Sequence, residues 1–131
     1  MTYGPPGQRF RLAGEPAGRA SWAAWLSWAL ITAENPGGQR VTAHENSMAS
    51  IRLRAELRAR GLTYLSAVNG EGEWAEAACL VRDLPLGGAL ELARAFGQAA
   101  LLWGVGRRAA LIGVAPLQLR RAWVALLEQE P

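Results

Sequence analysis

The twenty residues from Leu62 to Val81, LTYLSAVNGEGEWAEAACLV, decide the predicted fold because they hold two strand-like runs around a tight turn. Leu62 to Val68 is rich in Leu, Thr, Tyr and Val, and a second run spans Glu73 to Val81. The intervening Asn69-Gly70-Glu71-Gly72 is typical of a hairpin turn. This stretch therefore predicts a pair of antiparallel strands.

Upstream of this hairpin the sequence predicts a strand followed by a helix. Trp28 to Ala33 is an apolar run of the length expected for a buried strand. Thr42-Ala43-His44-Glu45 matches a capping box, in which the threonine side chain accepts from the backbone N–H of Glu45. The helix that begins there should continue to about Arg60, with Gly61 in the left-handed position that ends many helices.

Downstream of the hairpin the sequence predicts a helix, a second hairpin and a final helix. Pro85 opens a helix that Gly97 stops. Two apolar runs, Ala99 to Trp103 and Ala109 to Val114, form the second hairpin. Pro116 opens a final helix, whose apolar face consists of Leu119, Trp123, Leu126 and Leu127.

These elements together predict an α+β fold. We expect a mostly antiparallel sheet with helices packed on one face, a βαββαβ centre that is ferredoxin-like or related, and an added C-terminal helix. Residues 1–18, rich in Gly and Pro, are expected to form an extended arm with a short edge strand at Arg9–Leu12. Residues 19–131 are expected to form a single domain.

The composition indicates a globular protein and argues against several classes. Half of the 131 residues are hydrophobic, and all 14 basic residues are arginines against 11 acidic ones, so the net charge is only +3. A bulk excess that small does not favour nucleic-acid binding, although it leaves it open. The apolar run Trp22–Ala33 is too short to span a membrane, and Met1–Gly18 lacks the apolar centre of a secretion signal. We expect a cytoplasmic protein without a membrane partner.

Several short motifs, taken in order, resemble an uncharacterised bacterial family known as domain of unknown function 3293. They are Ile31-Thr32-Ala33-Glu34-Asn35-Pro36, Glu45-Asn46, the LRARGLTYL of Leu57–Leu65, Trp74 with Glu76, Phe96-Gly97-Gln98-Ala99, and Trp103-Gly104. The resemblance covers roughly Trp28 to Trp103 and implies a single domain. It implies no particular activity, because the family is one of unknown function.

Motifs for familiar chemistries are missing from the sequence. It contains no phosphate-binding P-loop, no dinucleotide-binding glycine pattern and no paired-cysteine or paired-histidine metal motif. A catalytic triad has few candidate residues, because the sequence contains one histidine, His44, one cysteine, Cys79, and one aspartate, Asp83. We therefore expect no metal and no cofactor, and catalytic residues stay unassigned.

The loop from Glu34 to Asn46 is the best candidate for a ligand site. It leaves a predicted strand and enters a capped helix, where backbone N–H groups and a glycine pair can approach an anion. Arg40 adds a positive charge. The candidate ligand-binding residues are Asn35, Gly37, Gly38, Arg40, His44, Asn46 and Gln98. The alternative is that Asn-Pro-Gly-Gly is only a turn and the capping box only a cap.

Two further charged clusters favour structural interpretations. The arginines of the first long helix are spread around its circumference, as on a solvated face. Glu73 and Glu76 lie three residues apart on a predicted strand and so face opposite sides.

The leading functional hypothesis is a small binding or interaction module without catalytic activity. The alternative is a small enzyme, or a protein that binds an anionic or phosphate-containing ligand, in which the 34–46 loop forms the site and Glu34 or His44 acts as acid or base. Nucleic-acid binding is a third hypothesis. The partner is unknown, and the apolar residues on both sides of the first long helix are consistent with a homo-oligomer.

Overall fold

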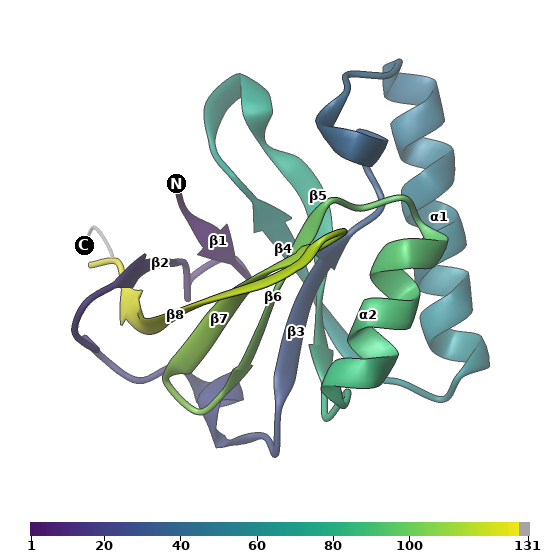
Figure 1. The fold of residues 1–131 in the computed structure, drawn as a ribbon. Coiled ribbons are helices and arrows are strands. Elements are labelled where there is room, and N and C mark those ends of the chain that lie inside the picture. The colour runs from purple at the N-terminus through teal and green to yellow at the C-terminus, as the bar shows by residue number, and fades with distance from the viewer. Residues whose placement is uncertain (129–131) are drawn as a thin grey trace.

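The computed structural model describes residues 1–128 and shows a closed antiparallel β-barrel with two α-helices packed on its outside (Figure 1). The strand order around the barrel is β1-β2-β8-β7-β6-β3-β5-β4. The strands are β1 (Tyr3–Gly4), β2 (Phe10–Ala13), β3 (Trp28–Thr32), β4 (Tyr64–Asn69), β5 (Glu76–Arg82), β6 (Ala100–Val105), β7 (Arg108–Val114) and β8 (Leu117–Leu126). The helices are α1 (Ala43–Ala59) and α2 (Leu86–Ala95), with short 3₁₀ turns at Ser21–Ala24, Pro36–Gly38 and Gly72–Trp74.

The inside of the barrel holds one hydrophobic core, built around aromatic rings. Phe10, Trp22 and Trp28 are fully buried, and the two indole rings meet edge to face at 5.1 Å. Alternate residues of β3 point inward, so Trp28 and Leu30 join this core while Ala29 and Ile31 face outward. The large rings fill the interior of a barrel that is too narrow to stay empty.

A second core lies between the barrel and the helices. Leu53 and Leu57 of α1 and Leu92 of α2 are buried against the outward side chains of β3 and its neighbours, among them Ile31. Because both faces of β3 are covered, all five of its residues are buried. Cys79 belongs to this outer core, and burial raises the pKa of its thiol to about 11, so the thiol is protonated at neutral pH.

The prediction of an open, ferredoxin-like sheet is wrong. β3, α1, β4, β5, α2 and β6 do follow one another along the chain, and β3 pairs antiparallel with both β5 and β6. The sheet does not stay open, however, because four further strands close it into a barrel. Closure depends on the segment expected as an extended arm, because residues 1–18 contribute β1 and β2. β1 joins β4, and β2 joins β8, so these two short strands connect the ends of the sheet.

The predicted C-terminal helix is also wrong, since that segment is the longest strand, β8. Ala115 and Pro116 form the turn of a hairpin, and β8 pairs with β7 from Leu117 opposite Val114 to Trp123 opposite Arg108. The apolar residues that would share one face of a helix are divided between the two faces of the strand, since Leu119 and Trp123 line the outer surface whereas Leu126 packs against the inner core that includes Val124. Residues 129–131 of the predicted domain lie outside the described residues.

Candidate functional site

The loop from Glu34 to Asn46 connects β3 to α1 at one end of the barrel (Figure 1). Asn35 has a φ of 47° and Gly37 a φ of 68°, both in the left-handed region, which lets the chain reverse direction within a few residues. The loop ends at Thr42, whose hydroxyl accepts a 3.1 Å hydrogen bond from the Glu45 backbone N–H. The predicted helix cap is therefore present.

The Asn35 and Asn46 side chains hold the two ends of the loop together. Asn46 Nδ2 donates to Asn35 Oδ1 at 3.0 Å, and the Asn35 backbone N–H donates to Asn46 Oδ1 at 2.8 Å. Asn35 Oδ1 also accepts from the Val41 backbone N–H at 3.2 Å. This reciprocal pair closes the loop onto the first turn of α1.

A carboxylate from a distant segment extends this network. Asn35 Nδ2 donates to one oxygen of Glu76 at 2.9 Å, and Asn69 Nδ2 donates to the other oxygen at the same distance. Asn69 and Glu76 are direct cross-strand partners in the β4–β5 hairpin. Glu76 thus joins the loop to that hairpin, and its two carboxylate oxygens are both engaged.

Glu34 forms a second set of contacts beside the first. One of its carboxylate oxygens accepts from the Ser50 hydroxyl at 2.9 Å and the other from the Ala77 backbone N–H at 3.2 Å. Its backbone carbonyl accepts from Gln98 Nε2 at 3.1 Å. Glu34 therefore links the loop to α1 and β5, and Gln98 links it to the end of α2.

The glycine pair does not present free N–H groups to an anion. The Gly37 N–H donates to the Gly97 carbonyl at 2.8 Å, and the Gly38 N–H donates to the Asn35 carbonyl at 2.9 Å. A ligand that used these donors would have to displace the bond from Gly37 to the end of α2 and the bond from Gly38 that closes the turn within the loop.

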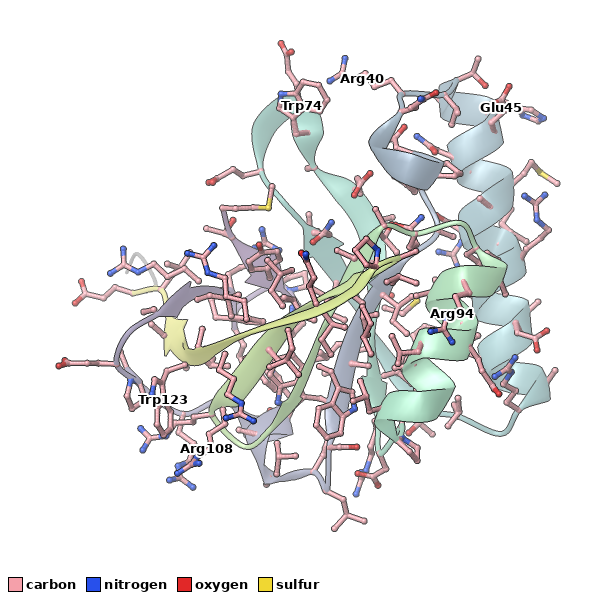
Figure 2. All side chains as sticks on the ribbon, in the orientation of Figure 1. Arg40, Glu45, Trp74, Arg94, Arg108 and Trp123 are labelled. Carbon is pink, nitrogen blue, oxygen red and sulfur yellow. The ribbon has the colours of Figure 1, made fainter. Side chains whose placement is uncertain are left out.

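The other two candidate residues lie apart from the network, at the surface. Figure 2 shows the Arg40 side chain beside Trp74, and its guanidinium lies 4.2 Å from the centre of the indole ring. Arg40 also donates to the Glu73 carbonyl at 3.0 Å. His44 is exposed in the first turn of α1. The structure thus brings together Asn35, Asn46 and Gln98 but leaves Arg40 and His44 outside them.

Sequence reasoning singled out the loop but did not connect Glu76, Asn69 and Ser50 to it. Their contacts depend on the register of the β4–β5 hairpin and on how α1 lies against β5. The one available signal was the family resemblance, since its motifs include Glu34, Asn35, Asn46, Glu76 and Gln98. These motif residues form two adjacent sets of hydrogen bonds, one around Asn35 and Glu76 and one around Glu34.

A different surface is open to ligands, on the outer side of β6, β7 and β8. A groove of about 700 Å³, here called the outer groove, runs between α2 and β8. Its lining includes Leu86, Trp103, Ala110, Leu119, Arg121 and Trp123. The Arg108 guanidinium, which also lines the groove, lies 5.1 Å from the centre of the Trp123 ring. Both side chains are labelled in Figure 2. The outer groove is therefore mainly apolar with arginines at its rim.

A second hollow of about 440 Å³, here called the inner hollow, lies on the opposite side of β8, at the mouth of the barrel. Tyr3, Leu12, Leu111 and Arg120 contribute to its lining. Burial raises the pKa of the Tyr3 hydroxyl, which therefore stays protonated at neutral pH.

Residues 1–128 contain no group of three or more His, Cys, Asp or Glu side chains arranged to hold a metal ion. In the same part of the chain, no helix combines the length and the apolar character needed to cross a membrane.

The fold and the loop define a small closed-barrel protein in which a polar network secures the connection from β3 to α1. The chain belongs to the family described as protein of unknown function (DUF3293), whose model matches residues 31–101. The match begins in β3 and ends in β6, so it includes the whole network. Searches among curated proteins and among solved structures find no match to this chain.

Proposed function

We propose that this protein is a small cytoplasmic binding module without catalytic activity and that its partner occupies the outer groove. The observation that carries the proposal is the contrast between the two candidate surfaces. In the loop, the polar side chains are already hydrogen-bonded within the protein: Asn35 donates to Glu76 of β5, and Glu34 accepts from Ser50 and the Ala77 backbone. The outer groove, by comparison, is open and apolar and has arginine side chains at its rim. The buried thiol of Cys79 suits a reducing compartment.

The lining of the outer groove indicates the chemistry of its ligand. Leu86, Trp103 and Leu119 offer apolar surface, whose removal from water favours binding. Arg108 and Arg121 offer guanidinium groups that bind carboxylates or phosphates well. A partner that places an apolar group next to an acidic one fits both features.

The proposal is tested with a twelve-carbon carboxylate, dodecanoate, as a probe of this chemistry, and with a cationic detergent of equal chain length as its control. Amide and indole NMR shifts should change at Trp103, Ala110 and Trp123 with dodecanoate and much less with the cation. Arg121→Glu should weaken binding about fivefold or more, as expected for losing ~1 kcal/mol from an ion pair.

Arg94→Glu is the matched control variant, because Arg94 is an exposed arginine on α2 that does not line the outer groove. It should bind dodecanoate like the parent protein. Shifts centred on residues 34–46 would instead favour the alternative of a ligand site in the loop. Absence of any shift in the groove at millimolar dodecanoate would contradict the proposal.

A further inference from the structure

β8 has an edge that no other strand of residues 1–128 covers. β2 pairs with β8 only from Trp123 to Leu126, where β2 ends at Ala13. The preceding part of β8, Leu117 to Ala122, pairs with β7 on one side and with no described strand on the other. We call residues 117–122 the free edge.

The backbone groups on the free edge can be identified from the hydrogen-bond pattern of β8. The Val124 N–H donates to the Arg107 carbonyl at 2.7 Å, so Val124 faces the β7 side. The Leu127 N–H donates to the Arg9 carbonyl at 2.9 Å, on the β2 side. Because successive residues of a strand direct their N–H and C=O groups to opposite sides, Leu117, Leu119 and Arg121 present theirs to the free edge.

The two hollows flank the free edge and meet where β2 ends. Ala13, Gly14, Arg121 and Ala122 line both the outer groove and the inner hollow. The two hollows therefore adjoin each other beside the free edge, one on each side of β8. This position matches that of a strand continuing the line of β2 beyond Ala13.

The charge around the free edge is positive and unbalanced. Residues 108–126, which form the β7–β8 hairpin, contain three arginines and no acidic residue. Within the described part of the chain, none of Arg108, Arg120 and Arg121 forms an ion pair. Arg120 lies opposite Leu111 and lines the inner hollow, whereas Arg121 lies opposite Ala110 and lines both hollows.

We infer that the partner is an acidic peptide segment in extended conformation, which adds to the free edge of β8 as an extra strand. Its backbone bonds to Leu117, Leu119 and Arg121, as in other complexes formed by strand addition. Alternate side chains then enter the two hollows: apolar ones lie in the outer groove, and carboxylates meet Arg120 on the inner side. The inference rests on the proposed function and names its partner.

The exposed side chains favour a peptide over a single-stranded nucleic acid. Leu117 and Leu119 are 63% and 52% exposed, and these aliphatic side chains offer no face for stacking a base. The Arg108 guanidinium already lies over the Trp123 ring, where a base would otherwise stack. An unpaired row of strand N–H and C=O groups is a template for another backbone and gives no advantage to a nucleic acid.

The test uses a blocked hexapeptide that alternates valine and glutamate, titrated into the full chain by calorimetry and followed by amide NMR. Shifts should centre on Leu117, Leu119 and Arg121. A version N-methylated on alternate peptide nitrogens keeps every side chain but loses backbone donors, and it should bind about tenfold more weakly, or worse. A valine–lysine peptide should not bind.

Two variants separate the charge effect from any effect on folding. Arg120→Glu should weaken the valine–glutamate peptide about tenfold, because one attractive pair becomes a repulsive one. Arg94→Glu makes the same change of charge away from the site and should bind like the parent. If Arg120→Glu is unfolded by circular dichroism, Arg120→Gln provides the same comparison with a smaller expected loss of about threefold.

The outcomes distinguish this inference from the proposed function. If dodecanoate binds in the outer groove but N-methylation leaves peptide affinity unchanged, strand addition is overturned and the proposed function stands. If neither probe shifts the groove, both fail. Salt-sensitive binding of oligothymidine at Arg120 and Arg121, without peptide binding, would replace the peptide with a nucleic acid. A dimer that sedimentation detects and that buries β8 would replace it with a second copy of the chain.

Discussion

At the scale of single residues, Asn35 determines the shape of the loop. It adopts a left-handed φ of 47°, which asparagine tolerates better than other side chains, and its amide group bonds to Val41, Asn46 and Glu76. One residue thus supplies both the backbone conformation and three of the side-chain bonds that secure the loop. Such a position is constrained by structure whether or not a ligand binds nearby.

The two contributions of Asn35 can be measured separately. Asn35→Gly keeps the left-handed backbone at low cost but removes the side chain, and we expect a loss of about 1–2 kcal/mol in the free energy of unfolding. Asn35→Ala also removes the amide group but keeps a Cβ atom in the left-handed conformation, so it should lower the free energy of unfolding by about 1 kcal/mol more than Asn35→Gly. Urea denaturation of both variants checks this. Equal stability of Asn35→Gly and the parent would show that the network adds nothing.

At the scale of elements, β6 can pair with β3 beside Trp28 only because it has a glycine at that position. A Cβ at Gly104 would overlap the Trp28 indole ring and would lie 2.6 Å from the Arg108 carbonyl oxygen. Trp28 is fully buried, and its Nε1 donates to the Gly106 carbonyl at 3.0 Å. The ring is therefore held by both packing and a hydrogen bond, and β6 must fit against it.

Gly104→Ala should accordingly destabilise the protein strongly, by about 3 kcal/mol, because neither the indole ring nor the backbone of β7 can move aside easily. Gly113→Ala is the matched control on the neighbouring strand, since a Cβ there would meet its nearest atom at an ordinary 3.6 Å. It should change stability by less than about 1 kcal/mol. The two melting curves test this, and similar losses for both variants would contradict the packing argument.

At the scale of the whole molecule, Arg9 ties together the strands that close the barrel. Its guanidinium donates to the carbonyls of Gly4, Val68 and Gly70 at 2.9, 2.6 and 2.8 Å, and to the Thr2 hydroxyl at 2.7 Å. These acceptors lie on or beside β1 and β4, whereas Arg9 itself directly precedes β2. β1 pairs with β2 and β4 through only a few residues, so the Arg9 side chain supplies much of the hydrogen bonding that joins these three strands.

Arg9→Met should therefore weaken the attachment of β1 to β2 and β4. It should lower the free energy of unfolding by about 3 kcal/mol, because three backbone carbonyls lose a charged donor. Arg9→Lys should restore little, since one ammonium group cannot reproduce the fork of a guanidinium. Arg11→Met is the control, an exposed arginine two residues away. Hydrogen exchange at Tyr3 and Val68 measures the effect, and parent-like protection in Arg9→Met would refute it.

Short-range sequence signals were enough to predict the local structure around α1 and the two hairpins. Thr42 and Glu45 mark the start of α1 and Gly61, with a φ of 71°, its end, because capping depends on a few neighbouring residues. Turn residues and β-rich runs likewise placed the β4–β5 and β6–β7 hairpins. The loop at 34–46 was recognised as distinctive for the same local reasons, through its glycines and its helix cap.

The closure of the sheet and the strand conformation of the last segment depend on contacts between residues that are far apart in the sequence. The spacing of Leu119, Trp123 and Leu126 is compatible with a helix. In the folded protein, however, this segment pairs with β7 and packs Val124 inside the barrel, and neither contact can be predicted from the neighbouring residues alone. In the same way, Glu76 meets Asn35 only because strand register brings them together. Hydrogen bonds between distant strands stabilise the protein only once the whole sheet forms. Closure of the barrel, the polar network and the free edge of β8 therefore arise only in the folded molecule.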